Sequence, residues 1–283
     1  MAPGLRSPLA WGVLAVGLAA TAALAWATRT AHEEKTREEF HRRVDAALHA
    51  IRSRMISYEY VARAGAAFLA ARSEPTKAEW SAYVGAMRIE RDFPGMALAY
   101  GKPAEIEADA PRRLAMERAR DTGEASLSGK IALPGEAFRG QPPQQAGVVL
   151  FMPVYRKGSA IGTVEERRAA LQGYVYSPIR VNDALVIGSH TLRDLELELY
   201  DGERAYETAA LAGRVGELRT RSEMSSMPDL TRTARLDLAG RPWTVKLEAR
   251  NGFEDRLSRR LSTVVAAAGV LISLLAFFLA ARR

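Results

Sequence analysis

The residues of this chain best suited to bind a metal ion are its four histidines, His32, His41, His49 and His190. Three of them lie on one segment that is predicted to be helical, and His41 and His49 are eight positions apart, so they share a helix face only loosely. A zinc site needs several nitrogen, sulfur or carboxylate ligands that converge on one point. The chain has no cysteine, and the sequence therefore predicts neither a metal site nor a cofactor.

The hydroxyl and carboxylate side chains do not form a catalytic pattern either. Ser126 and Ser128 have no nearby base to activate them as nucleophiles. The acidic pairs at 33–34 and 38–39 fit the solvated face of a helix. The sequence contains no glycine-rich phosphate loop. We therefore predict no catalytic residue and expect that the protein is not an enzyme.

Two apolar segments bracket the chain. Residues 9–28 and 261–280 each run twenty residues without a charge, and a helix needs about 20 apolar residues to cross a bilayer. We predict two transmembrane helices around a soluble body at 29–260. The first segment also fits a cleaved signal peptide, because Arg6 precedes it and small residues such as those at 25–27 could form a cleavage site.

The net charge of +7 and the pI near 9.8 do not indicate a nucleic-acid partner. The basic residues alternate with acidic ones instead of forming one stripe. Arg256, Arg259 and Arg260 lie beside the second span, where we expect them to attract anionic lipid headgroups. Charge does not orient the body, because long segments cross the membrane largely regardless of their charge.

The segment after the first span has the apolar spacing of a helix. Its stripe comprises Phe40, Val44, Ala47, Leu48, Ile51, Met55, Tyr58, Ala62, Gly65 and Leu69. One interpretation is a stalk that leaves the membrane and pairs with a second stalk, and the other is a helix that packs on the body. The two are compatible, because a long helix can do both.

The body is predicted to be α+β. Thr76 and Glu79 have capping-box spacing, which predicts a second helix with Trp80, Tyr83, Val84 and Met87 on its inner face. Pro94 and Gly95 predict a turn. Further helices are predicted at 111–121 and 180–190, and strands at 96–100, 127–133, 147–155, 171–179, 195–200, 235–238 and 243–249.

Several motifs follow one another in an order that resembles a known family. They are Phe93-Pro94-Gly95-Met96, Ala119-Arg120-Asp121-Thr122-Gly123, Gly147-Val148-Val149-Leu150, Pro153-Val154-Tyr155, Glu165-Glu166-Arg167-Arg168, and Gly173-Tyr174-Val175 followed by Arg180. In this order and spacing they are similar to CHASE domains. These are extracytoplasmic sensor modules of membrane-bound histidine kinases, nucleotide cyclases and cyclic-di-GMP enzymes, including the plant cytokinin receptor kinases. The resemblance extends from the stalk to about residue 187.

The resemblance implies a long N-terminal stalk helix that supports two PAS-like α/β subdomains, flanked by two transmembrane helices. It places the body outside the cytoplasm, at the inner (cell) membrane and in the periplasm if the source is bacterial. The expected divisions are 1–8 (tail), 9–28 (transmembrane helix 1), 29–72 (stalk), 73–187 (membrane-distal CHASE sensor region), 188–250 (membrane-proximal β-rich region), 251–260 (connector helix) and 261–280 (transmembrane helix 2).

The resemblance also suggests a ligand site. The position of a ligand-holding aspartate in the cytokinin receptors falls on Glu105, and Leu127 matches a pocket-lining leucine. Further candidate pocket walls are Met96, Leu98, Tyr100, Phe151, Pro153 and Tyr155. The chain departs from the family pattern here, because the crossing at 101–110 is too short for the family's additional strand. Glu105 is therefore either a ligand-binding carboxylate or an exposed residue at a helix start, where negative charge is favourable.

The resemblance implies a sensor that binds a small extracellular ligand and passes a signal through its stalk and spans. No effector domain follows the second span, so the chain is either a fragment or signals through a separate cytoplasmic partner such as a histidine kinase or diguanylate cyclase. We expect a homodimer. The alternative is a degenerate CHASE module that binds no ligand and serves as a structural or dimerisation partner of a signalling protein.

Overall fold

The computed structural model of the protein describes most of the chain. The described residues are 8–72, 76–106, 109–133, 145–185, 195–204, 210–215, 230–250, 253 and 256–281. They divide into two compact units, of which the first comprises 1–42, 223–230 and 249–283, and the second 43–222 and 231–248. Each unit is described by itself.

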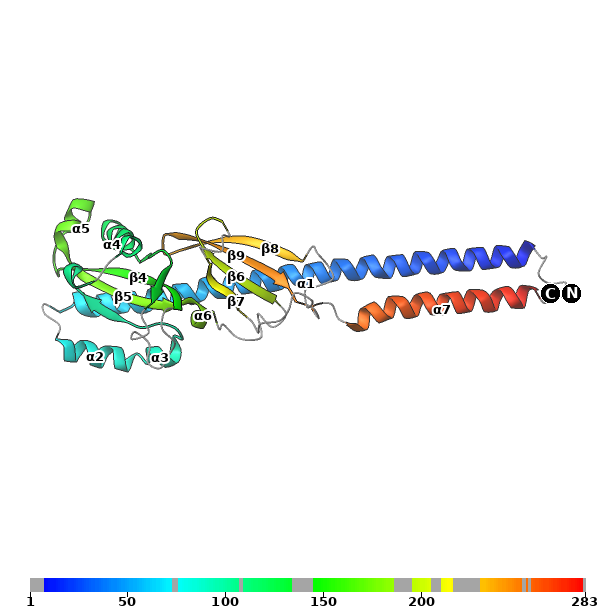
Figure 1. Cartoon of the computed structure of the whole chain (residues 1–283), viewed down its shortest axis with the longest axis horizontal. Coiled ribbons are helices and arrows are strands. Elements are labelled where there is room, and N and C mark those ends of the chain that lie inside the picture. The colour runs from blue at the N-terminus through cyan, green and yellow to red at the C-terminus, as the bar shows by residue number, and fades with distance from the viewer. Residues whose placement is uncertain are drawn as a thin grey trace. The chain divides into compact units, whose positions relative to one another are not determined.

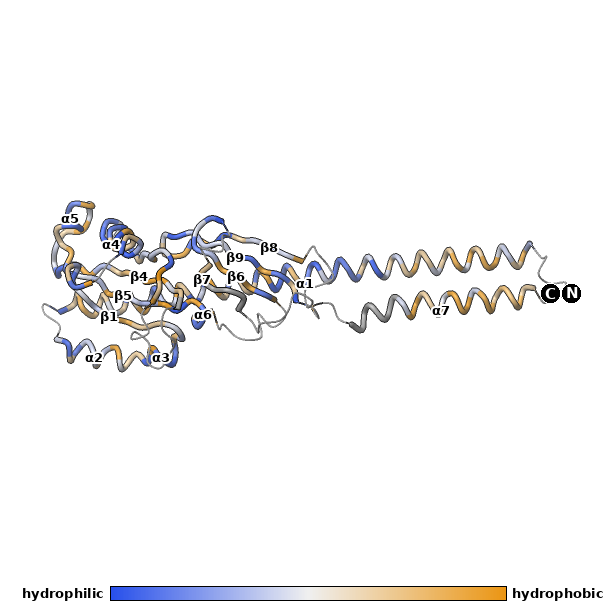
Figure 2. The backbone as a smooth tube through the Cα atoms, in the orientation of Figure 1, coloured by the Kyte–Doolittle hydropathy of each residue, from blue (hydrophilic) through white to orange (hydrophobic). Residues whose placement is uncertain are grey.

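The first span and the predicted stalk form one uninterrupted helix, α1 (Pro8–Ala70), as the sequence predicts (Figure 1). Its first part belongs to the first unit and the part after residue 42 to the second. The helix α7 (Arg256–Ala281) follows the connector. Both helices are long and apolar enough to cross a membrane, as the apolar stretches in Figure 2 illustrate.

Within the first unit, the apolar parts of α1 and α7 pack closely on each other. Trp11 and Phe277 meet edge to face at 5.2 Å between ring centroids. A Cβ atom on Gly17 would lie 2.6 Å from Ser273 Oγ, and one on Gly269 would lie 2.3 Å from Thr21 Cγ2. Each glycine therefore receives a hydroxyl-bearing residue of the other helix, the kind of small-residue contact that lets helices approach closely in membranes.

This packing predicts that Gly17→Leu separates the two spans. In a Trp11→Cys/Phe277→Cys variant, whose two positions meet across the helices, a short bifunctional thiol reagent is expected to cross-link the chain internally, and no native cysteine competes. Adding Gly17→Leu should lower the cross-linking yield severalfold, whereas Gly12→Leu should not, because a Cβ at Gly12 meets nothing within 4 Å. Equal yields for the two leucine variants would contradict the close packing.

The apolar stripe of α1 is buried inside the protomer. Val44, Ile51, Tyr58 and Leu69 are each at most 2% exposed. A Cβ on Gly65 would lie 3.4 Å from side-chain atoms of both Leu98 and Val175, so part of the stripe packs under a β-sheet. The interpretation of a helix that packs on the body is therefore confirmed. The same side chains are therefore covered within the protomer, and pairing with a second stalk stays a prediction.

The second unit contains two antiparallel sheets (Figure 1). The first has the order β1-β5-β4-β2, with β3 also paired to β4. Its strands are β1 (Ala99–Gly101), β2 (Ser126–Leu127), β3 (Ile131–Leu133), β4 (Gln145–Tyr155) and β5 (Leu171–Arg180). The two long central strands match the prediction. The predicted strands 96–100 and 127–133 are shorter, and the second is split into β2 and β3.

Short helices surround this sheet. They are α2 (Lys77–Ala86), α3 (Ile89–Asp92), the 3-10 helix η2 (Pro103–Glu105), α4 (Ala110–Thr122), α5 (Val164–Ala170) and α6 (Val181–Ala184). The capping box at Thr76 and Glu79 is present as predicted. Helix α4 ends at Gly123, whose left-handed conformation closes the last turn. The helix predicted at 180–190 is only one turn in its described part.

The second sheet has the order β7-β6-β9-β8. Its strands are β6 (Leu195–Asp201), β7 (Ala210–Val215), β8 (Thr231–Leu238) and β9 (Arg241–Ala249). Leu195, Leu197 and Leu199 alternate with half-buried residues and form its core face with Val245 and Leu247. The sequence predicted three of these strands and missed β7.

Candidate functional site

All the candidate ligand residues except Glu105 lie on one or the other of the two faces of the first sheet. Successive side chains of a strand point to opposite faces, and paired residues of neighbouring strands share a face. Phe151 pairs with Tyr176 and Pro153 with Tyr174, whereas Tyr100 pairs with Val175 on the other face. The candidates on the sheet therefore divide between its two faces.

Phe151, Pro153 and Tyr155 lie on the face that α4 covers. Phe151 is fully buried in a cluster with Met116 and Ala119 of α4 and with Val149 and Tyr174 of the sheet. It meets Tyr174 edge to face at 6.0 Å between centroids. This part of the face is a packed core, and Ile106, Leu171 and Tyr176 extend it as partly buried residues at its edge.

Two tyrosine hydroxyls fasten α4 to this face. Tyr174 donates a hydrogen bond of 2.9 Å to the Met116 carbonyl, and Tyr155 donates one of 2.7 Å to the Arg120 carbonyl. Burial raises the pKa of Tyr174 to about 12 and also raises the pKa of Tyr155. Both groups are therefore neutral hydrogen-bond donors at physiological pH and position a helix.

Met96, Leu98, Tyr100 and Leu127 lie on the face toward α1. Met96, Leu98 and Leu127 are buried. Tyr100 is half-buried, and its ring centroid lies 6.4 Å from that of Trp80 of α2. Tyr83 in turn stacks on Phe68 of α1 at 4.3 Å. The predicted inner face of α2 therefore does meet the body, although none of its residues is fully buried.

Glu105 lies on the surface at the short crossing from β1 to α4. Its side chain is exposed and accepts a hydrogen bond of 3.0 Å from the backbone N–H of Lys102, which closes η2. Burial raises the pKa of Tyr100, and the charge of Glu105 adds to this effect. The described residues of the crossing form η2 and no strand. Glu105 is therefore exposed, as in the second interpretation, but it caps η2, whereas the start of α4 is capped by Asp109.

The Phe-Pro-Gly turn connects α1 to α6, and we call it the joint. Gly95 has a φ of +78°, and a Cβ there would lie 2.7 Å from the Arg180 carbonyl oxygen and 2.8 Å from Asp183 Cβ. The hydroxyl of Tyr58 donates to the Pro94 carbonyl at 2.5 Å, and burial raises its pKa to about 12. This motif therefore locks α1 and α6 together at the end of the first sheet.

A second motif forms an ion cluster whose role the sequence did not indicate. Asp121, at the end of α4, accepts hydrogen bonds from Arg168 at 2.7 and 3.0 Å and from Arg120 at 2.6 Å. The Arg167 side chain donates to the Asp121 carbonyl at 2.8 Å. The cluster fastens α4 to α5, so these charges are used within the protein.

The ion pairs of Asp121 predict how the stability of the fold depends on pH in acid. Hydrogen bonds from Arg168 and then Arg120 hold the pKa of Asp121 well below its ordinary value. A lowered carboxylate pKa stabilises the fold above the unfolded pKa of about 4, and this contribution is lost as the pH falls through the folded pKa. In Asp121→Asn the melting temperature should therefore drop less between pH 6 and pH 3 than in the wild type. Identical pH profiles in thermal melts would contradict a stabilising role for this cluster.

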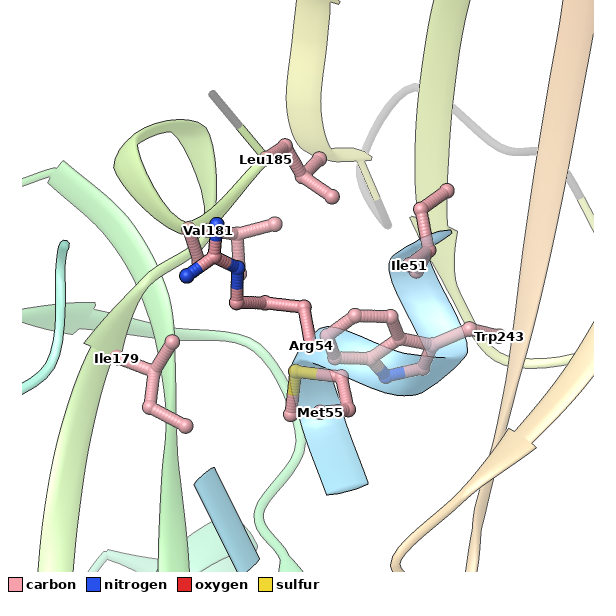
Figure 3. A pocket seen from close by; sticks show the side chains of 8 residues that line it. Ile51, Arg54, Met55, Ile179, Val181, Leu185 and Trp243 are labelled. Carbon is pink, nitrogen blue, oxygen red and sulfur yellow. The ribbon is translucent and has the colours of Figure 1, made fainter. Parts of the chain in front are cut away.

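A small cavity lies where the two sheets approach α1 and α6. Its volume is about 10 Å³, which is the scale of a single water molecule. Figure 3 shows the side chains that converge on it, namely Ile51, Arg54, Met55, Ile179, Val181, Leu185 and Trp243. The buried indole N–H of Trp243 has no hydrogen-bond partner among the described residues. The cavity is far below the size that a small organic ligand needs.

The comparison with protein families agrees with the sequence motifs. Residues 104–211 match the family model of the CHASE domain. Among curated proteins, no sequence matches this chain. A solved structure, an extracellular ligand binding receptor from Desulfohalobium retbaense DSM5692, is similar with a TM-score of 0.48 and 12% sequence identity. The similarity covers 74% of this chain and 40% of that chain, so the chain spans less than half of the receptor's length.

Proposed function

We propose that the protein is a membrane-anchored extracytoplasmic sensor, because residues 104–211 match the family model of the CHASE domain. In this proposal it binds a small extracellular ligand and passes the signal across the membrane through α1 and α7. The observation that carries the proposal is the position of the CHASE domain between two helices that are each apolar and long enough to span a membrane.

The proposed topology places the body in the periplasm of a bacterial cell and both spans in its inner membrane. The first sheet would then form a membrane-distal PAS-like subdomain within 73–187, and the second a membrane-proximal one within 188–250. The segments 29–72 and 251–260 would connect them to the spans at 9–28 and 261–280.

An alkaline phosphatase fusion tests this topology. Fused after Ala160, in a loop before α5, the phosphatase is expected to be active, because it folds only outside the cytoplasm. A fusion after residue 283 should be inactive, since two spans return the chain to the cytoplasm. An inactive fusion at Ala160 with an active one at the C-terminus would contradict the periplasmic placement.

For the ligand we propose the α4 side of the first sheet. Phe151, Pro153 and Tyr155 lie on this side, and its edge carries the partly buried Tyr176. Glu105 could supply a carboxylate from the neighbouring crossing. A ligand would have to displace part of the packed core, and that need favours a mechanism in which binding moves α4. Met96, Leu98, Tyr100 and Leu127 would respond from the opposite face.

The packed core also favours a second candidate function. Phe151 is fully buried against α4, and the hydroxyls of Tyr155 and Tyr174 are already bonded to α4 carbonyls. These contacts suit a CHASE module that has lost its pocket and acts as a structural or dimerisation partner of a separate signalling protein. A homodimer would have to use a surface other than the buried stripe of α1.

Thermal melts and calorimetry of the full chain in lipid nanodiscs distinguish the two functions. For the sensor we expect at least one compound of a small-molecule library to raise the melting temperature and to release or absorb heat on titration. Phe151→Leu should weaken that binding, whereas Ile161→Ala, on an exposed loop, should not. A library without any binder, together with a stable dimer in solution, would favour the structural module.

A further inference from the structure

The turn between β8 and β9 reaches from the second sheet to the first. The backbone N–H of Leu127 in β2 donates to the carbonyl of Ala239 at 3.1 Å. The Arg118 side chain of α4 donates to the next carbonyl, that of Gly240, at 2.9 Å. Ala239 and Gly240 both have positive φ, at 42° and 73°, as a tight hairpin turn requires. The turn therefore presents two consecutive carbonyls to the first sheet.

A partly buried ion pair adds a third connection beside this turn. Asp201, at the end of β6, accepts hydrogen bonds from both Nε and Nη2 of Arg241, the first residue of β9. The same carboxylate accepts the backbone N–H of Lys130 at 2.8 Å. Its side chain is only 9% exposed. A carboxylate this buried is costly unless it is paired, so the loop at Lys130 and the guanidinium of Arg241 are held together.

The fit around Arg241 is close. A Cβ on Gly129 would lie 2.9 Å from Arg241 Nη2 and 3.3 Å from the Cβ of Pro111. Because Gly129 has no side chain, its backbone can lie directly between the guanidinium of Arg241 and the first turn of α4. We call this set of contacts the interlock: Arg118, Leu127 and Lys130 of the first sheet's side with Asp201, the turn 239–240 and Arg241 of the second.

Helix α4 takes part in both the interlock and the core of the first sheet. Met116 and Ala119 are buried on the sheet, while Arg118, between them, is exposed and reaches the turn. A shift of α4 along or away from the sheet must therefore stretch the bond to Gly240. Because β8 and β9 are paired over eight residue pairs, a displacement of their turn is shared by both strands.

We propose that the interlock transmits displacements of α4 to the β8–β9 hairpin, so that the two sheets change state together. The proposal rests on the proposed sensor function only for the source of the displacement, which would be a ligand on the α4 side. The coupling itself is a property of the fold and can be measured without any ligand.

Hydrogen exchange of the full chain in nanodiscs, followed by mass spectrometry, tests the coupling. Met116→Ala loosens α4 from within the first sheet's core. In the otherwise native chain it is expected to speed exchange in peptides from 231–249 by about fivefold or more, the range for residues in one network. In an Arg118→Leu background, the same Met116→Ala substitution should leave exchange in 231–249 nearly unchanged.

Two further variants complete the test. Arg241→Leu should speed exchange of the Lys130 and Leu127 amides; if it prevents folding, Arg118→Leu still decides the question, because that side chain is exposed. The control is Arg235→Leu, which removes a β8 arginine that pairs with Glu203 and Asp237 and should preserve the coupling. A Met116→Ala effect on 231–249 that is absent, or equally large in the Arg118→Leu background, would overturn the proposal. A failed ligand screen would leave it standing.

Discussion

Replacing Gly95 by alanine is expected to destabilise the second unit by about 3 kcal/mol, because a strained backbone and a steric overlap are combined. The φ of +78° disfavours any L side chain, and the added methyl would meet the Arg180 carbonyl oxygen at 2.7 Å and the Ala184 nitrogen at 2.9 Å. These neighbours are backbone atoms and cannot rotate away. For a body of this size the melting temperature should fall by about 6–12 °C.

The matched control is Gly158→Ala. Gly158 has nearly the same φ, +77°, but a Cβ there meets nothing within 4 Å. It should cost about 1 kcal/mol, from the backbone alone. Thermal melts of the full chain in nanodiscs, followed by near-ultraviolet circular dichroism, measure both variants. Equal losses would mean that the contact with α6 contributes nothing, and the Phe-Pro-Gly turn would then not be the joint described above.

Replacing Phe151 by alanine is expected to destabilise the protein by about 3–5 kcal/mol, as truncation of a fully buried aromatic side chain does. The ring lies between α4 and the sheet with no exposed surface, and Tyr174 and Tyr176 flank it at 6.0 and 6.2 Å between centroids. The hydroxyl bonds that hold α4 should keep the surrounding core from collapsing fully into the space.

Phe151→Ala also distinguishes a packed core from an open pocket. A side chain that lined an open, hydrated pocket would cost far less to truncate, because water already fills the space beside it. Denaturant unfolding of Phe151→Ala and of Ile161→Ala, which is 46% exposed, provides the comparison. The second variant should change the stability by less than about 0.5 kcal/mol. A similarly small effect at Phe151 would favour a preformed ligand pocket.

The short-range features of the fold could be read from the sequence. The continuous helix α1, the capping box at Thr76, the proline and glycine that begin and end α4, and the central strands β4 and β5 all depend on neighbouring residues. The missed or shortened elements depend on distant partners. Among the described strands, β7 pairs with β6 alone, and β1 is limited to the residues that face β5.

The candidate site shows the same division. Sequence identified Phe151, Tyr100 and Leu127 as apolar residues near family motifs, but not the strand register that sends Phe151 to one face and the other two to the opposite face. Arg118, Asp201 and Arg241 played no part in the prediction from sequence. Arg118 reaches Gly240 across 122 residues and Arg241 reaches Asp201 across 40, and both contacts lie where the turn at Ala239 docks on β2.

The sequence by itself determined that this chain has two apolar segments long enough to span a membrane, a long helix with an apolar stripe, and an α+β body with CHASE-like motifs, because periodicity and capping are local properties. Only the tertiary structure decided what covers the stripe, that Glu105 is exposed, and that the α4 side of the sheet is packed. Whether a side chain is buried depends on segments that are distant in sequence. How much it then stabilises the fold depends on the residues that those segments pack against it.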